Sequence, residues 1–173
     1  MIAATAFERP YPPLLDWLAS HDLEYEIREH DRAFTASATA AAEGVDPHTF
    51  AKVIGLLTEE GRSVLVILDA TDQLDLYKAR RAVGSNDVRL LSEAELTALA
   101  PGCEIGAIPA VGSILGLPMY ADEAVRKDPE ISFNAGSHRF SARVERAGWE
   151  RACGVVYADL AIDRETRPAR ARA

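Results

Sequence analysis

The sequence predicts an α+β fold built around a mixed β-sheet. Several segments alternate apolar and polar residues at strand spacing, and the predicted strands outnumber the long predicted helices. The two kinds of element do not alternate regularly along the chain, as they would in a doubly wound parallel sheet. These observations favour a sheet with flanking helices.

The elements of the first half follow from local patterns. Two prolines precede an apolar stripe at helical spacing, which predicts a helix over 12–21. Tyr25 and Ile27 alternate with charged residues, the pattern of a half-buried strand over 24–30. An alanine-rich segment predicts a short helix that ends at Gly44. Two apolar runs joined by a glycine-containing turn then predict a β-hairpin over 50–69.

The second half begins with a helix and a strand and then becomes rich in glycine and proline. We expect a helix that closes at Gly84, a strand over 87–91, and a second helix that starts at the capping box of Ser92 and Glu95 and ends before Pro101. The long segment 101–122 is interpreted as a loop, and loops of this length are more often functional than decorative. The remaining elements are predicted as two strands within 130–144 that meet at a turn over 134–137, a short helix near 145–152, a strand within 154–160 and a flexible basic tail over 164–173.

Composition restricts the class of protein. With 173 residues, 48% hydrophobic and 27% charged, the chain fits a single domain over 1–173 that buries a real core. No apolar stretch approaches the roughly 20 residues of a membrane helix, and the N-terminus lacks the pattern of a secretory signal. Cys103 and Cys153 stand alone, which favours a reducing, cytoplasmic location over a disulfide framework. The net charge of −8 argues against extended duplex-DNA binding and leaves room for a small basic site.

Lys52 lies inside an apolar run, His48–Leu57, that reads as a buried strand. Its aliphatic stem can pack on apolar surface while the ammonium reaches water. The alternative is a lysine held at the edge of a pocket to meet an anion. From these ten residues alone the first interpretation is the simpler one.

Common catalytic and metal-binding motifs are missing from the sequence. The four histidines, His21, His30, His48 and His138, show no metal-ligand spacing, so we expect no metal. The segment 112–116 places its serine one position too early for a nucleophile elbow, and no glycine-rich phosphate loop occurs.

Two stretches remain as candidates. Gly106, Pro109 and Gly112 can fix a tight loop that exposes backbone groups to a ligand, although an ordinary turn is the simpler reading. The turn predicted at 134–137 would present His138 at the start of a strand, as a solvent-facing residue or as a ligand contact.

Three segments together resemble a known family. FAKVIGLL (50–57), CEIGAIPAVG (103–112) and ISFNAGSH (131–138), in this order and at this separation, are similar to the YbaK-like aminoacyl-tRNA deacylases. That family includes the editing domain of bacterial prolyl-tRNA synthetases and its free-standing, ProX-type relatives. The resemblance covers roughly residues 23–160, and the segment 69–84 also looks like the family's strand-to-helix connection.

The resemblance implies a mixed, curved, barrel-like sheet flanked by helices, no cofactor, and a pocket for the aminoacylated end of a tRNA. It implies that hydrolysis depends on Lys52. It further implies that the substrate is bordered by two segments, whose matching residues are Gly106, Ala107, Ile108 and Pro109 in the first and Gly136, Ser137 and His138 in the second. Water would be activated by the free ribose hydroxyl of the substrate. The implied partners are the tRNA acceptor end and an aminoacyl-tRNA synthetase, with no membrane, and the oligomeric state stays open.

One departure from the family concerns the pocket. Relatives often carry a second proline and an aromatic residue after the position of Pro109, where this chain has Ala110 and Val111. We expect Ile108, Ala110, Val111 and Ile114 to build an apolar wall. Such a wall favours a trans-editing hydrolase acting on a tRNA charged with a small or medium uncharged amino acid.

Two other functions stay open at this point. Lys78, Arg80 and Arg81, with the arginine-rich tail, would suit a nucleic-acid-binding or regulatory protein on the same fold, although a solvated helix face is the simpler reading. A domain that has lost activity and serves as an interaction partner is the third, suggested only by Ala110.

Overall fold

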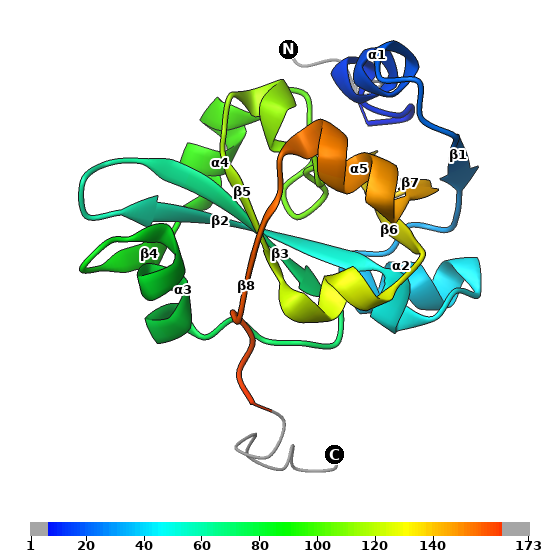
Figure 1. Cartoon of the computed structure of the whole chain (residues 1–173). Helices are drawn as coiled ribbons and strands as arrows, with labels where there is room; N and C mark the ends of the chain where they lie inside the picture. The colour runs from blue at the N-terminus through cyan, green and yellow to red at the C-terminus, as the bar shows by residue number, and fades with distance from the viewer. Residues whose placement is uncertain (1–6, 164–173) are drawn as a thin grey trace, which may run out of the picture.

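A computed structural model of the chain describes residues 7–163 (Figure 1). The helices are α1 (Pro12–Ser20), α2 (Ala36–Glu43), α3 (Leu76–Val83), α4 (Glu93–Leu99) and α5 (Arg146–Cys153), with short 3₁₀ helices η1 (Pro47–Thr49), η2 (Gly112–Leu115) and η3 (Glu123–Lys127). The strands are β1 (Tyr25–Glu29), β2 (Ala51–Thr58), β3 (Ser63–Asp69), β4 (Val88–Leu90), β5 (Met119–Asp122), β6 (Glu130–Ser137), β7 (Phe140–Glu145) and β8 (Val156–Ala158). The basic tail predicted at 164–173 lies outside the described residues.

The strands form two sheets. One has the order β4-β2-β3-β5-β8, antiparallel at β4-β2-β3 and parallel at β3-β5-β8. The other is the antiparallel sheet β1-β7-β6. An isolated bridge between Phe50 and Ser132 links them. The predicted mixed α+β class is confirmed, and within residues 7–163 the strands do not close into a barrel.

The main core lies between the two sheets, and helices cover their remaining apolar surface. Leu65 and Ile67 of β3 face this core, which also includes Phe133 of β6 and Trp149 of α5. The alternate residues of β3 pack on the opposite side against α3, at Val64, Val66 and Leu68. Burial on both faces explains why β3 reads as a continuous apolar run rather than an alternating one. Figure 1 shows α5 beside β6 and β7, and α3 beside β4.

Several local predictions are confirmed. β2 and β3 form the predicted hairpin. Gly84 ends α3 with a φ of 70°, and its N–H donates to the carbonyls of Arg80 and Arg81. Ser92 and Glu95 form both hydrogen bonds of the capping box that starts α4.

Two local predictions are wrong. No turn occupies 134–137, because β6 continues through Ser137 with an irregular register and the chain reverses at 138–139. Gly136, at a φ of 87°, bulges the strand instead of ending it. The segment 101–122 is not all loop, since it contains β5, a four-residue strand whose partners β3 and β8 are distant in sequence. The strand predicted over 24–30, in contrast, is present as β1, the edge strand of its sheet, with Tyr25 43% exposed.

Within the described residues, no helix is long and apolar enough to cross a membrane. The same residues contain no cluster of three or more His, Cys, Asp or Glu side chains arranged to hold a metal ion. Cys103 and Cys153 are both free thiols.

Candidate functional site

A cavity of about 470 Å³ lies beside the first half of β2. Five segments contribute to it: the start of α2, β2, the residue that follows β3, the loop that follows α4, and β6. Its lining is Phe34, Thr35, Ala36, Ser37, Ala51, Lys52, Val53, Ile54, Ala70, Gly106, Ile108 and Asn134. Three of the predicted site residues, Lys52, Gly106 and Ile108, therefore meet in one cavity although they are far apart in sequence.

The pairing of β2 explains the position of the cavity. β3 runs along one edge of β2 from Ala51 to Leu57, whereas β4 pairs with the other edge only from Leu56 to Thr58. Ahead of that short ladder, the cavity borders residues 51–54. The gap in the sheet thus provides the space in which a ligand can approach Lys52.

Lys52 carries the only charged side chain in this lining, as far as residues 7–163 are described. It is partly buried, and its ammonium donates a hydrogen bond to the carbonyl of Asp72. A cation beside a partly desolvated cavity attracts anions more strongly than one in bulk water. Lys52 therefore faces a ligand-sized space, and its role in hydrolysis stays a prediction.

The loop at 104–109 is fastened to the end of β6 by backbone hydrogen bonds. The N–H of Gly136 donates to the carbonyl of Ala107 at 2.8 Å, and the N–H of Glu104 donates to the carbonyl of Gly136 at 2.9 Å. A Cβ on Gly136 would lie 2.5 Å from the Cβ of Tyr11, so only glycine fits there. Gly136 therefore acts as the point at which the loop is held against the sheet.

His138 supports the same loop from behind. Its Nε2–H donates to the carbonyl of Ile105 at 2.7 Å, and its backbone N–H donates to the Glu104 carboxylate at 2.7 Å. Because Nε2 faces a carbonyl, the neutral ring carries its proton there, which leaves Nδ1 as an acceptor. Nδ1 is buried and has no hydrogen-bond partner among the described residues. His138 is outside the cavity lining. It lies next to Gly106, because a Cβ built on Gly106 would be 3.4 Å from Cε1 of His138.

The other predicted site residues are also outside the lining. Ala107 and Pro109 belong to the loop but are buried, and the Ser137 hydroxyl donates to the carbonyl of Phe7 at 2.6 Å. Five predicted residues therefore do not line the cavity: Ala107, Pro109, Gly136, Ser137 and His138. Of these, Gly136 and His138 hold the loop in place.

The prediction of an apolar wall in the cavity is wrong for three of its four residues. Only Ile108 lines the cavity. Ala110 and Val111 belong to the main core, against which Ile114 packs. The Trp149 indole donates to the carbonyl of Ala110 at 2.7 Å, which fixes this segment under α5. The departure at Ala110 and Val111 therefore affects the core and not the cavity lining.

Four polar or aromatic residues of the lining were not predicted from the sequence. Thr35 is the N-cap of α2 and accepts from the N–H of Ala38 at 3.0 Å, a spacing that could have been recognised. Ser37 donates to the carbonyl of Ala70 at 3.2 Å. The Asn134 amide donates to the carbonyl of Gly106 at 3.4 Å, while its Oδ1 is buried with no partner among the described residues. The fourth missed residue is Phe34, which precedes the cap.

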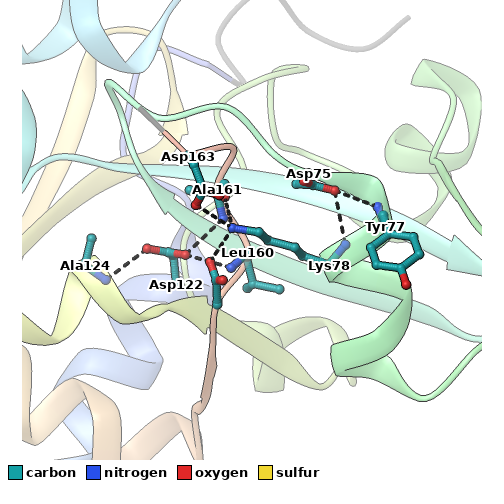
Figure 2. Close-up of polar contacts among 9 residues, drawn as sticks. Asp75, Tyr77, Lys78, Asp122, Ala124, Leu160, Ala161 and Asp163 are labelled. Atoms are coloured by element: carbon teal, nitrogen blue, oxygen red, sulfur yellow. Dashed lines mark hydrogen bonds and ion pairs between the residues drawn. The ribbon is translucent and has the colours of Figure 1, made fainter. Parts of the chain in front are cut away.

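A second cavity, of about 500 Å³, is lined by several aspartates, and the contacts of these aspartates hold the fold together. Asp122 accepts hydrogen bonds from the N–H groups of Ala124, Leu160 and Ala161 (Figure 2). Lys78 binds the carboxylates of Asp159 and Asp163, each at 2.9 Å, and these two ion pairs raise its pKa. These contacts tie the last described residues to α3 and η3.

Comparison with known proteins identifies the family. The sequence profile of the aminoacyl-tRNA editing domain matches residues 30–152. The chain belongs to this family. A proline–tRNA ligase from Shouchella clausii (strain KSM-K16) is 31% identical over 144 residues, which make up 83% of this chain and 25% of the ligase. The chain thus spans about a quarter of that relative's length.

Solved structures agree with this assignment. A proposed trans-editing enzyme for prolyl-tRNA synthetase superposes with a TM-score of 0.78 at 26% identity, over 94% of this chain and 100% of that one. A scaffold protein from a study of epitope grafting by computational design gives a TM-score of 0.74 at 27% identity, over 88% of this chain and 99% of that one. The resemblance to YbaK-like proteins of the aminoacyl-tRNA editing family is confirmed.

Proposed function

We propose that the chain is a trans-editing hydrolase that cleaves the ester between a tRNA and a wrongly attached amino acid. The observation that carries the proposal is the cavity lining of an editing domain: one lysine, Lys52, among apolar and hydroxyl side chains. This combination suits a ligand with an anionic, hydroxyl-rich end and an uncharged amino acid.

The lining also supports a preference for small or medium uncharged amino acids. The side chains of Ala51, Val53, Ile54 and Ile108 are apolar, and no carboxylate belongs to the lining within residues 7–163. A charged substrate side chain would lose several kcal/mol of hydration without gaining a partner. Apolar side chains are separated more weakly, at about 1–3 kcal/mol per methylene, so the choice among small amino acids depends on exclusion by size or on the tRNA.

The proposed hydrolysis uses water activated by the substrate itself. Lys52 binds the terminal ribose and stabilises the negative charge that develops on the carbonyl oxygen of the ester. The backbone of the loop at Gly106 meets the α-amino group. Burial raises the pKa of the Cys103 thiol to about 12, so that group remains protonated, and His138 already donates to Ile105. The free ribose hydroxyl then orients the attacking water by a hydrogen bond and relays the proton of that water to the neighbouring ester oxygen of the ribose, which leaves as a hydroxyl.

We extend the proposal to the biological partner. The identity with a proline–tRNA ligase supports a role beside prolyl-tRNA synthetase, clearing tRNA that this enzyme has mischarged. Aminoacyl-tRNA is made in the cytoplasm, and the two free thiols fit that compartment. The competing nucleic-acid-binding hypothesis loses support, because Lys78 is engaged by Asp159 and Asp163.

The test is a deacylation screen over a panel of mischarged tRNAs. We expect one or two small aminoacyl groups to be hydrolysed well and lysyl, arginyl, aspartyl and glutamyl esters hardly at all. A charged aminoacyl-tRNA as the fastest substrate would overturn the proposed specificity. Hydrolysis of none of them would overturn the proposed function.

A further inference from the structure

Phe34 stands out at the mouth of the cavity. It lines the cavity and yet is 67% exposed, which is the largest exposed fraction among the large hydrophobic side chains of the described residues. It belongs to no hydrophobic core cluster. Single exposed aromatic side chains are common on protein surfaces, so the significance of Phe34 lies in its position at the cavity and not in its exposure alone.

The surroundings of Phe34 are organised rather than incidental. Its ring lies 5.1 Å from the ring of His138, centroid to centroid, at an interplanar angle of 50°. The guanidinium of Arg32 lies 6.0 Å from the Phe34 centroid and forms an ion pair with Glu104 at 2.6 Å. Glu104 in turn accepts from the N–H of His138. An exposed aromatic ring and an exposed cation are thus held together beside the cavity by the loop that carries Gly106.

We infer that Phe34 is the stacking platform for the terminal adenine of the tRNA acceptor end, with Arg32 meeting the phosphate of that nucleotide. This inference rests on the proposed function. The amino acid is esterified to the terminal ribose, so when the ester lies next to Lys52 the base is one sugar away, at the mouth. Bases in single-stranded nucleic-acid ends are held by stacking on aromatic side chains and by cations that follow the backbone.

The charges fit this arrangement. Lys52 lies in the cavity and Arg32 lies beside Phe34, so the proposed path has one cation at the ester and another near the base. A protein substrate would offer neither a base to stack nor a regularly placed anion. The aromatic and the cation together therefore favour a nucleotide over a peptide as the occupant.

The first experiment compares two substrates of one small amino acid. One is 2′(3′)-aminoacyl-adenosine, and the other is its ester with 1-deoxyribose, which keeps the sugar hydroxyls and lacks the base. Phe34→Ala should lower kcat/KM for the adenosine ester by about 5- to 150-fold, the value of one stacked base, and leave the baseless ester unchanged. Phe34→Trp, which keeps an aromatic ring at this position, should hydrolyse the adenosine ester at about the wild-type rate. An equal loss on both esters, or no loss on either, overturns the inference.

Tyr77 provides a matched control. It is also an exposed aromatic, at 57%, with the guanidinium of Arg80 4.6 Å from its centroid, but it lies on α3 outside the cavity lining. Tyr77→Ala should leave the hydrolysis of aminoacyl-adenosine unchanged. Arg32→Gln should slow the hydrolysis of aminoacyl-tRNA. It should not slow the hydrolysis of aminoacyl-adenosine, because that substrate has no phosphate. An unchanged rate on aminoacyl-adenosine also shows that losing the ion pair with Glu104 has not disturbed the loop.

A binding measurement separates this inference from the proposed function. Trp17 and Trp149 are buried, so the extra fluorescence of Phe34→Trp over wild type comes from the cavity mouth. We expect 5′-AMP to quench it in a saturable way and ribose 5-phosphate to leave it unchanged. Quenching in a protein that hydrolyses no aminoacyl-tRNA would overturn the proposed function and keep the nucleotide platform. Failure of AMP to quench, in an active enzyme, would overturn the platform alone.

Discussion

Gly106→Val tests whether the loop backbone meets the substrate. Gly106 has a φ of 83°, a conformation that costs an L-residue about 1–3 kcal/mol. An added Cβ would lie 3.4 Å from Cε1 of His138, an ordinary contact distance, so the backbone strain is the main cost to the fold. In a protein of this size that cost lowers Tm by roughly 2–12 °C, which leaves the variant folded at room temperature.

The expected loss of activity is larger than this stability change implies. The new side chain stands at the cavity lining, where we propose that the backbone meets the α-amino group. Removing one hydrogen bond to a charged group costs about 1.5–3 kcal/mol, which corresponds to roughly a 10- to 150-fold fall in kcat/KM.

Gly116→Val separates backbone strain from substrate contact. Gly116 has a φ of 69°, and nothing lies within 4 Å of a Cβ built on it. It caps η2 and is outside the cavity lining, so it carries the same kind of strain without the contact. The assays are thermal unfolding and deacylation of the best substrate from the panel. Normal kinetics for Gly106→Val, or an equal fall for Gly116→Val, would refute the reasoning.

The remaining predictions concern single ionisable groups. Lys52→Ala should lower deacylation by about 100-fold or more with an unchanged far-UV circular dichroism spectrum, and normal turnover would make the lysine a packing residue. Burial raises the pKa of Cys103 and Cys153 to about 12, so iodoacetamide at pH 8 should label the folded protein far more slowly than the urea-unfolded chain. Arg89 lowers the pKa of Glu95 to about 2, below its ordinary 4.5, so this carboxylate stabilises the fold above about pH 4.5 and stops doing so as the pH falls through 2. Glu95→Gln should accordingly lower Tm at pH 7 and lower it much less at pH 2, and the same Tm difference at both pH values would contradict the assigned pKa.

The sequence predicted those elements whose signals are local. The hairpin of β2 and β3, the glycine cap of α3 and the capping box of α4 depend on residues within a few positions of each other. β5 was missed because its stability comes from parallel pairing with β3 and β8, which lie more than thirty residues away along the chain. The turn at 134–137 was misplaced because a glycine at positive φ serves a bulge as well as it serves a turn.

The candidate site divides in a similar way. The motifs located the loop and the lysine, but not which of their residues face the cavity. Whether Gly106 lines the cavity while Ala107 faces inward is decided by the hydrogen bonds between that loop and Gly136, a contact across almost thirty residues. Phe34 was not predicted as a cavity residue, because an aromatic residue before a helix cap is usually assigned to the core.

The net charge of −8 is compatible with the proposed binding of an anionic tRNA end, because the buried acidic side chains and Lys52 lie at different cavities. A large share of the buried acids, including Asp69, Asp72 and Asp122, lies at the second cavity, where they accept hydrogen bonds or lie near basic side chains. The lining of the first cavity contains Lys52 and no carboxylate within residues 7–163. Few phosphates can contact so small a basic site, and the salt dependence of binding scales with that number. Turnover should therefore weaken only mildly between 50 and 200 mM salt, whereas a fall of about a thousandfold would indicate a long phosphate track and a different mode of binding.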